Sequence, residues 1–97
     1  MKKNIFQKEA KKAFLIELYE LKAFYASKDF NVGDLCQEIL NCKGKVFLTG
    51  VGKSGHIANK ISATFSSTGT SSFFIHPAEA LHGDMGMIEK NDCIIVL

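Results

Sequence analysis

The chain has 97 residues, of which 46% are hydrophobic and 23% are charged, and its formal net charge is +2. These values describe one ordinary globular unit that buries only roughly 60 to 65% of its unfolded surface without a partner. The 12 basic residues are all lysines and are interspersed with acids, which disfavours a nucleic-acid partner. No leader is visible and no apolar stretch could span a bilayer, so a membrane partner is disfavoured and a cytoplasmic protein is expected.

The first predicted element is a long amphipathic helix over about residues 4 to 27, within an N-terminal segment of residues 1–30. Its apolar side chains recur in steps of three and four, which places them on one helix face. This face packs either on the chain's own sheet or on another subunit, and the sequence leaves both open. The residues of the stripe are Phe6, Ala10, Phe14, Leu18, Leu21 and Tyr25.

A shorter helix is predicted after the capping residues at Asn31 to Asp34, and it ends at Lys43-Gly44. A strand at Val46 to Leu48 follows directly. The inward face of this helix is expected at Leu35, Cys36, Ile39 and Leu40.

Three cysteines occur, and their spacing matches neither a Cys-x-x-Cys pair nor a zinc cluster. Free cysteine behaves as a small apolar residue, so we expect reduced and mostly buried thiols. The three are Cys36, Cys42 and Cys93.

The run GVGKSGH at Gly50 to His56 lies between the strand and a helical pattern that starts near Ile57. A strand, a glycine turn and a helix N-terminus in that order predict an anion site, because backbone N–H groups and the helix dipole favour negative charge. Lys53 adds a mobile cation. Ser54 either contacts the anion or caps the helix.

The remaining pattern predicts a helix that ends at Gly69, a strand at Ser72 to Ile75, an irregular loop at His76 to Met87 and a strand at Cys93 to Leu97. The helix faces inward with Ile57, Ala58, Ile61 and Phe65, and the loop has room for one helical turn at Ala78 to Leu81. Helices that alternate with apolar strands predict an α/β fold with a parallel sheet. The last strand is typical of a sheet centre, so we expect an incomplete sheet.

Two nucleotide sites are disfavoured. The glycines satisfy G-x-G-x-x-G, but the expected acid at the end of the next strand is missing, since His76-Pro77 stands there. A P-loop requires a glycine where Phe47 stands. A sugar phosphate fits better, with acid or base groups from Lys53, His82, Glu79 and Asp84.

Four stretches resemble arabinose-5-phosphate isomerases of the sugar isomerase (SIS) domain superfamily. They are GVGKSGHI from Gly50, STGT from Ser67, FFIHPAEA from Phe73 and HGDMGM from His82. The resemblance implies a three-layer αβα, Rossmann-like SIS fold with only the first three or so strands present. It also implies interconversion of D-ribulose 5-phosphate and D-arabinose 5-phosphate through an enediol, at the entry to Kdo for lipopolysaccharide or capsule. No redox cofactor is required, zinc is possible but not essential, and a homo-oligomer, a tetramer in full-length relatives, is expected.

The resemblance also implies roles for individual residues. Lys53 matches a catalytic lysine, although an exposed turn lysine is the alternative. His82 matches a substrate-contacting histidine, or else is a structural loop residue. His76 matches a histidine linked to zinc, but one histidine before a proline is a poor metal site and a structural role is favoured. The implied substrate-binding residues are Gly52, Ser54, Gly69, Thr70 and His82.

The family's serine-rich phosphate loop, its later catalytic residues and its CBS modules do not occur in these residues. We therefore expect residues 1–97 to be the N-terminal part of one SIS domain, and to be inactive alone. A non-catalytic SIS module that senses a sugar phosphate is one alternative. A dinucleotide-binding module is a weaker one.

Overall fold

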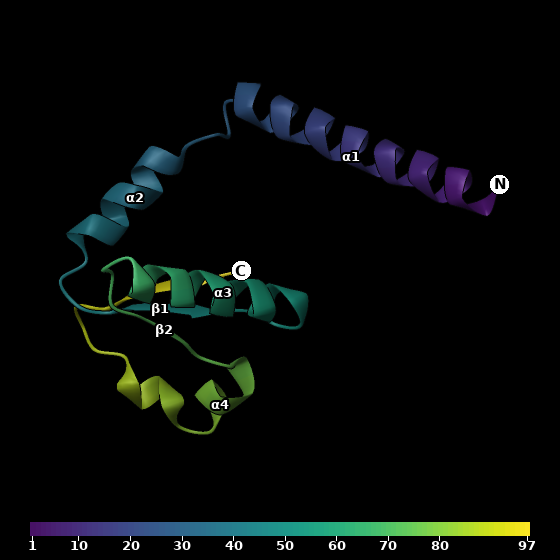
Figure 1. Ribbon diagram of the computed structural model, residues 1–97. Helices are drawn as coiled ribbons and strands as arrows, with labels where there is room; N and C mark the ends of the chain where they lie inside the picture. Colours follow the sequence, from purple (N-terminus) through teal and green to yellow (C-terminus); the bar gives the residue numbers. More distant parts are fainter. The chain divides into compact units, whose positions relative to one another are not determined.

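The computed structural model describes all 97 residues and divides into two compact units, residues 1–34 and 35–97. No helix combines the length and the apolar content that crossing a membrane requires. The elements in chain order (Figure 1) are α1 at Lys2–Ala26, α2 at Val32–Asn41, β1 at Val46–Thr49, α3 at Lys53–Ser67, β2 at Ser72–Phe74, α4 at Pro77–Leu81, the 3-10 helix η1 at Asp84–Met87 and β3 at Cys93–Val96.

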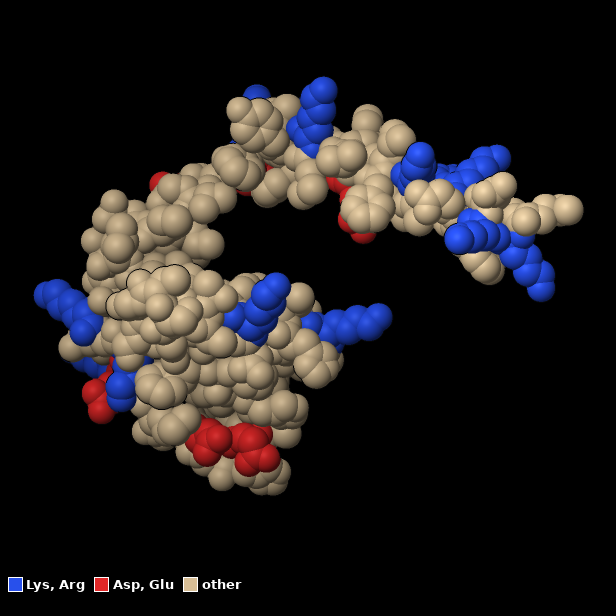
Figure 2. Space-filling model, in the orientation of Figure 1, with Lys and Arg blue, Asp and Glu red and all other residues tan.

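The predicted long helix is confirmed as α1, which buries none of its residues. Leu18 in the predicted stripe is 63% exposed, and Ile16, about 160° away around the helix axis, is 57% exposed. Apolar side chains therefore occupy more than the single face that the spacing predicted. Figure 2 shows the lysines of α1 mainly toward its N-terminal end, with acidic side chains nearer the middle of the helix. After α1, Phe30 packs edge-on against the rings of Phe24 and Tyr25, with centroids 5.4 and 6.0 Å away.

The second unit is built on a three-stranded parallel sheet in the order β2-β1-β3. Residues of the central strand pair on both sides, so that Leu48 lies opposite Phe74 of β2 and opposite Ile95 of β3. The last apolar run forms β3, which is an edge strand in this chain. β3 has one neighbour, which leaves Val96 72% exposed.

One face of the sheet packs against α3. Because side chains alternate along a strand, Val46 and Leu48 of β1 both point to this face, where Ala58 of α3 is fully buried against them. Four predicted inward positions are wrong: Leu35 is 50% exposed, Leu40 is 78% exposed and Ile57 is 53% exposed, and Cys36 is exposed too. The rest of this core consists of Ile39, Cys42, Ile61, Phe65, Phe74, Cys93 and Ile95, all partly buried.

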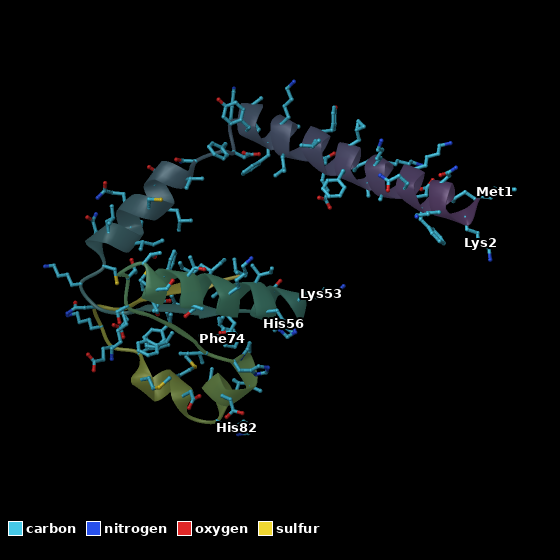
Figure 3. All side chains as sticks on the ribbon, in the orientation of Figure 1. Met1, Lys2, Lys53, His56, Phe74 and His82 are labelled. Carbon is cyan, nitrogen blue, oxygen red and sulfur yellow. The ribbon has the colours of Figure 1, made fainter.

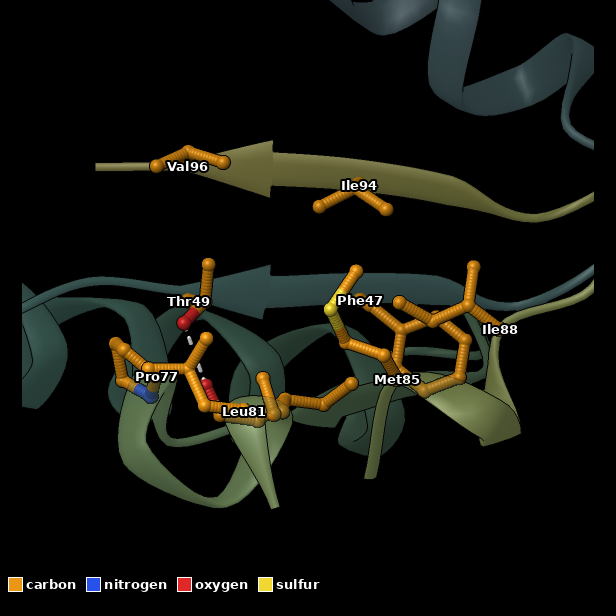
Figure 4. A pocket seen from close by; sticks show the side chains of 10 residues that line it. Phe47, Thr49, Pro77, Leu81, Met85, Ile88, Ile94 and Val96 are labelled. Atoms are coloured by element: carbon orange, nitrogen blue, oxygen red, sulfur yellow. Dashed lines mark hydrogen bonds between the residues drawn. The ribbon is translucent and has the colours of Figure 1, made fainter. Parts of the chain in front are cut away.

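The opposite face of the sheet carries α4 and η1, which gives the expected α, β, α layering. Phe47 and Ile75 are almost fully buried here. A cavity of about 410 Å³ remains between the sheet and the short helices. Figure 4 shows its wall, formed by Phe47, Thr49, Ile94 and Val96 from the strands and by Pro77, Leu81, Met85 and Ile88 from the segment that crosses over them.

A carboxylate ties the starts of β1 and β3 together. Asp92 accepts hydrogen bonds from the backbone N–H of Glu89 at 2.6 Å and of Lys45 at 2.8 Å. These two bonds, that of Glu89 first, hold the pKa of the Asp92 carboxyl below its ordinary value. A side chain on Gly44 would overlap this carboxylate. The ionised Asp92 thus holds the connection at the amino edge of the sheet.

We expect Asp92→Asn to lower the melting temperature of the chain by a few degrees at neutral pH, because one of the two N–H groups then meets an amide nitrogen instead of an oxygen. A lowered folded-state pKa means that the contribution of Asp92 is present above the unfolded-state pKa of about 3.9 and is lost as the pH falls through the folded-state value. Thermal unfolding followed by circular dichroism checks this. A difference between the two proteins that persists in strong acid would contradict it.

Candidate functional site

The glycine run lies at the carboxyl edge of the sheet, directly after the central strand. A Cβ added to Gly55 would lie 2.6 Å from the carbonyl oxygen of Gly50, and one added to Gly50 would lie 2.8 to 3.0 Å from the backbone of Ser54 and Gly55. These two glycines therefore press the end of β1 against the first turn of α3. The close approach needs glycine at both positions.

Gly52 lets the chain turn into the helix, since its φ of 61° and ψ of −127° are open to glycine but strained for other residues. Gly52 is also the N-cap, and no side chain caps α3. The helix begins at Lys53, four residues before the predicted start, and Ser54 is inside the first turn. The capping alternative for Ser54 is therefore wrong, and the first-turn N–H groups are left for a ligand.

A pocket of about 280 Å³ adjoins this turn. His56 and Asn59 of α3 line one side, and Phe74 and His76 from the end of β2 line the other, together with Gly50, Gly52 and Gly55. Asn59 and Phe74 are absent from the predicted site. Asn59 could have been found from helical spacing, because it lies one turn after Gly55. Phe74 could have been found only from the strand register.

His76 has a structural role as the N-cap of α4. Its Nδ1 accepts a hydrogen bond of 3.1 Å from the backbone N–H of Ala78. A neutral imidazole that accepts at Nδ1 carries its proton on Nε2, which is then a hydrogen-bond donor. The ring also packs edge-on against Phe74, with centroids 6.5 Å apart.

These residues do not fit a zinc site. No group of three or more His, Cys, Asp or Glu side chains in the chain is arranged to hold a metal. His56 and His76 line the same pocket, but two imidazoles fall short of the three or four protein ligands that zinc takes. Zinc binding at His76 stays a prediction that the geometry around it does not support.

The capping role leads to an expected result. We expect His76→Ala to destabilise the second unit by about 1 kcal/mol, which is typical for loss of an N-cap, and His76→Asn to retain most of the stability because asparagine caps well. Urea titration of both variants checks this. Equal losses of stability in His76→Ala and His76→Asn would contradict the capping role and would favour a role that requires the imidazole ring.

Lys53 and His82 are both exposed and lie on different elements. Lys53 is the first residue of α3, and His82 is the C-cap of α4. Figure 3 shows Lys53 and His56 at the start of α3 and His82 beyond α4, away from them. The structure therefore brings Gly52, His56 and His76 to one pocket, with Lys53 and Ser54 beside it in the same turn. It does not bring His82 into that pocket.

Gly69 and Thr70 lie at the opposite end of α3. Gly69 has a φ of 99°, and the Thr70 N–H donates to the Phe65 carbonyl at 2.8 Å, which is the capping pattern that ends many helices. The 15 residues of α3 separate them from Gly52 by roughly 20 Å. Within one chain, Gly52 and this pair cannot touch the same small ligand, so their role in substrate binding stays a prediction.

Comparison with known proteins gives matches of three kinds. Residues 39–97 match the family described as SIS domain. The chain is 48% identical to the arabinose 5-phosphate isomerase KdsD of Salmonella typhi over 95% of this chain, and 66% identical to KpsF of Escherichia coli O6:H1 over 61%. It covers 28% and 18% of those proteins. Among solved structures, the chain is similar to the protein c3406 of E. coli CFT073 in complex with arabinose 5-phosphate, with a TM-score of 0.81 and 44% identity. The similarity covers 96% of this chain and 50% of that one.

Proposed function

The chain belongs to the SIS domain family, which its residues 39–97 match, and we propose that residues 1–97 are the part of an arabinose 5-phosphate isomerase that carries Lys53. The reaction interconverts D-arabinose 5-phosphate and D-ribulose 5-phosphate, and its product serves Kdo formation. Relatives named as this enzyme, of which the chain covers about a quarter of the length, support the substrate class.

The observation that carries the proposal is the contact between Gly50 and Gly55. It holds the first turn of α3 at the end of β1, with Lys53 as the first helical residue. Unpaired N–H groups at a helix N-terminus and one adjacent cation are the arrangement that binds a phosphate monoester. In the proposal, the backbone of Gly52 to Gly55 and the Ser54 hydroxyl hold the phosphate of the sugar.

The isomerisation moves one proton between neighbouring carbons. A base removes the proton from C2 of the aldose while the carbonyl oxygen at C1 gains a proton, which gives the enediol. Return of a proton to C1 and loss of one from the C2 hydroxyl give the ketose. Negative charge develops on oxygen during both steps, so a fixed cation lowers both barriers. We assign Lys53 this role, and no step requires a redox cofactor or a metal.

His82 is assigned to the sugar rather than to the phosphate. An imidazole can donate to or accept from a hydroxyl near neutral pH, which suits either hydrogen bonding or proton transfer. Its position after α4 requires the ligand to extend away from the glycine turn, or the loop to close over it.

The proposal extends to assembly and location. A homo-oligomer, a tetramer in the full-length form, stays a prediction, and the exposed apolar side chains of α1 support it, with Phe14 68% and Leu21 67% exposed. A cytoplasmic location is proposed with it, since sugar phosphates are charged metabolites that do not cross membranes unaided.

A chimera tests the function. Residues 1–97 replace the aligned region of the Salmonella typhi relative, and formation of D-arabinose 5-phosphate is followed in a coupled assay. We expect turnover by the chimera, and binding without turnover by a polypeptide limited to residues 1–97. A soluble, folded chimera that binds the sugar phosphate without converting it would overturn the isomerase proposal and favour a sensing module.

A further inference from the structure

A pair of cysteines lies at the amino edge of the sheet, opposite the edge that carries the glycine turn. Cys42 follows the last residue of α2, and Cys93 is the first residue of β3. Both are half-buried, whereas Cys36 is exposed on α2, so the prediction of mostly buried thiols is wrong for Cys36. All three are free thiols in the structure.

The two half-buried thiols lie close together. The Cys42 Sγ donates to the carbonyl oxygen of Lys45 at 3.6 Å, and the backbone N–H of Cys93 donates to the same oxygen at 2.9 Å. The Cys42 Sγ also reaches the carbonyl oxygen of Asn91, two residues before Cys93, at 3.5 Å. Both side chains pack on the same core residues, under α3. Through these contacts with Lys45 and Asn91, the Cys42 thiol lies beside the start of β3, where Cys93 is the first residue.

An open cavity of about 330 Å³ is lined by both cysteines, so a small molecule can reach them. Lys43 and Lys90 lie on this cavity with the acids Glu38 and Asp92. This pair of cations and pair of anions can accommodate an oxidant that carries both carboxylate and ammonium groups. Burial raises the pKa of the Cys93 thiol, and the nearby Cys42 and Glu38 raise it further, which disfavours the Cys93 thiolate as the attacking group.

We propose that Cys42 and Cys93 are a reversible redox pair that forms an intramolecular disulfide with glutathione disulfide. The Cys42 thiolate attacks one sulfur of the oxidant, which forms a mixed disulfide and releases one glutathione. Cys93 then loses its proton to solvent and attacks the Cys42 sulfur, and the bond to the second glutathione breaks. Two protein thiols are oxidised, and one glutathione disulfide is reduced to two glutathiones.

The disulfide joins the end of α2 covalently to the start of the edge strand β3. It closes a long loop that contains β1, α3, β2, α4 and η1. Closing this loop restricts the unfolded chain and so stabilises the folded one. The active-site residues proposed above lie at the other edge of the sheet. Oxidation therefore changes the stability of the unit without blocking the glycine turn, and the inference does not rest on the proposed function.

The test uses the polypeptide of residues 1–97. The protein is incubated with glutathione disulfide, acid-quenched and weighed by mass spectrometry, and its proteolytic peptides are mapped. We expect a loss of about 2 Da and a peptide that joins Cys42 to Cys93, because two thiol hydrogens are removed. We expect the melting temperature to rise by about 5 °C or more and to return after reduction.

Cys36→Ser is the matched control and should form the same disulfide, whereas Cys42→Ser should not. The peptide map of the unmodified chain decides the question even if a variant fails to fold. A stable glutathione adduct on Cys42, or a covalent dimer through Cys36 with Cys42 and Cys93 still reduced, would overturn the proposal.

Discussion

We expect Lys53→Ala to lower the kcat/KM of the chimeric isomerase by about 100-fold or more. Loss of one preorganised group that stabilises developing negative charge costs this much in other enzymes. The change removes no buried contact, because Lys53 is exposed at the start of α3. The loss should therefore appear in turnover, while the melting temperature stays unchanged.

Lys60→Ala is the control for this prediction, since Lys60 is also exposed and lies two turns further along the same helix. It should leave kcat/KM unchanged. Lys53→Arg should recover part of the activity, because the charge is kept but a planar fork replaces a compact ammonium group. Turnover that survives Lys53→Ala would remove Lys53 from the catalytic assignment and leave the exposed-turn alternative.

The second large effect is expected for Gly55→Ala. A methyl group at this position overlaps the Gly50 carbonyl, and both partners are backbone, so the turn must move rather than a side chain. We expect the free energy of unfolding to fall by about 1 to 3 kcal/mol, as for other overpacked interiors. We also expect a loss of affinity for inorganic phosphate and D-arabinose 5-phosphate, because the first-turn N–H groups are displaced.

Gly33→Ala is the matched control, since a Cβ at Gly33 meets nothing within 4 Å and Gly33 lies in the helix α2. There the substitution should stabilise the chain by roughly 0.5 to 1 kcal/mol. Urea titration and isothermal titration calorimetry measure the two effects separately. If Gly55→Ala bound phosphate as tightly as the unmodified chain, the turn would not be the phosphate site.

The sequence predicted the elements whose signal is local. Val46 to Leu48 is an apolar run between Gly44 and Gly50, and it forms the buried part of β1. Gly69 was expected to end α3, and its positive φ confirms this. The parallel sheet was also expected, because helices that alternate with strands connect parallel neighbours, whereas the strand order β2-β1-β3 was not predicted.

Other features depend on side chains that are distant in sequence. The pocket brings together Asn59 and His76 because β2 pairs with β1 in one register, which no single segment encodes. The early start of α3 was missed because a glycine-rich run looks like a turn even where its second half is helical. The short helices after β2 are held by the His76 cap and by the sheet below rather than by a strong local pattern.

The register of the sheet also sets an order of assembly. Ser62 and Ser72, which join α3 to β2, are 10 positions apart, whereas the hydrogen bond between Lys45 and Asp92 spans 47 positions. Closing the longer loop loses more chain entropy, and this loss comes before the contacts of β3 can offset it with favourable free energy. We therefore expect the β1-α3-β2 unit to form first and β3 to pair last. We expect transient opening of this unit to begin at the β3 edge.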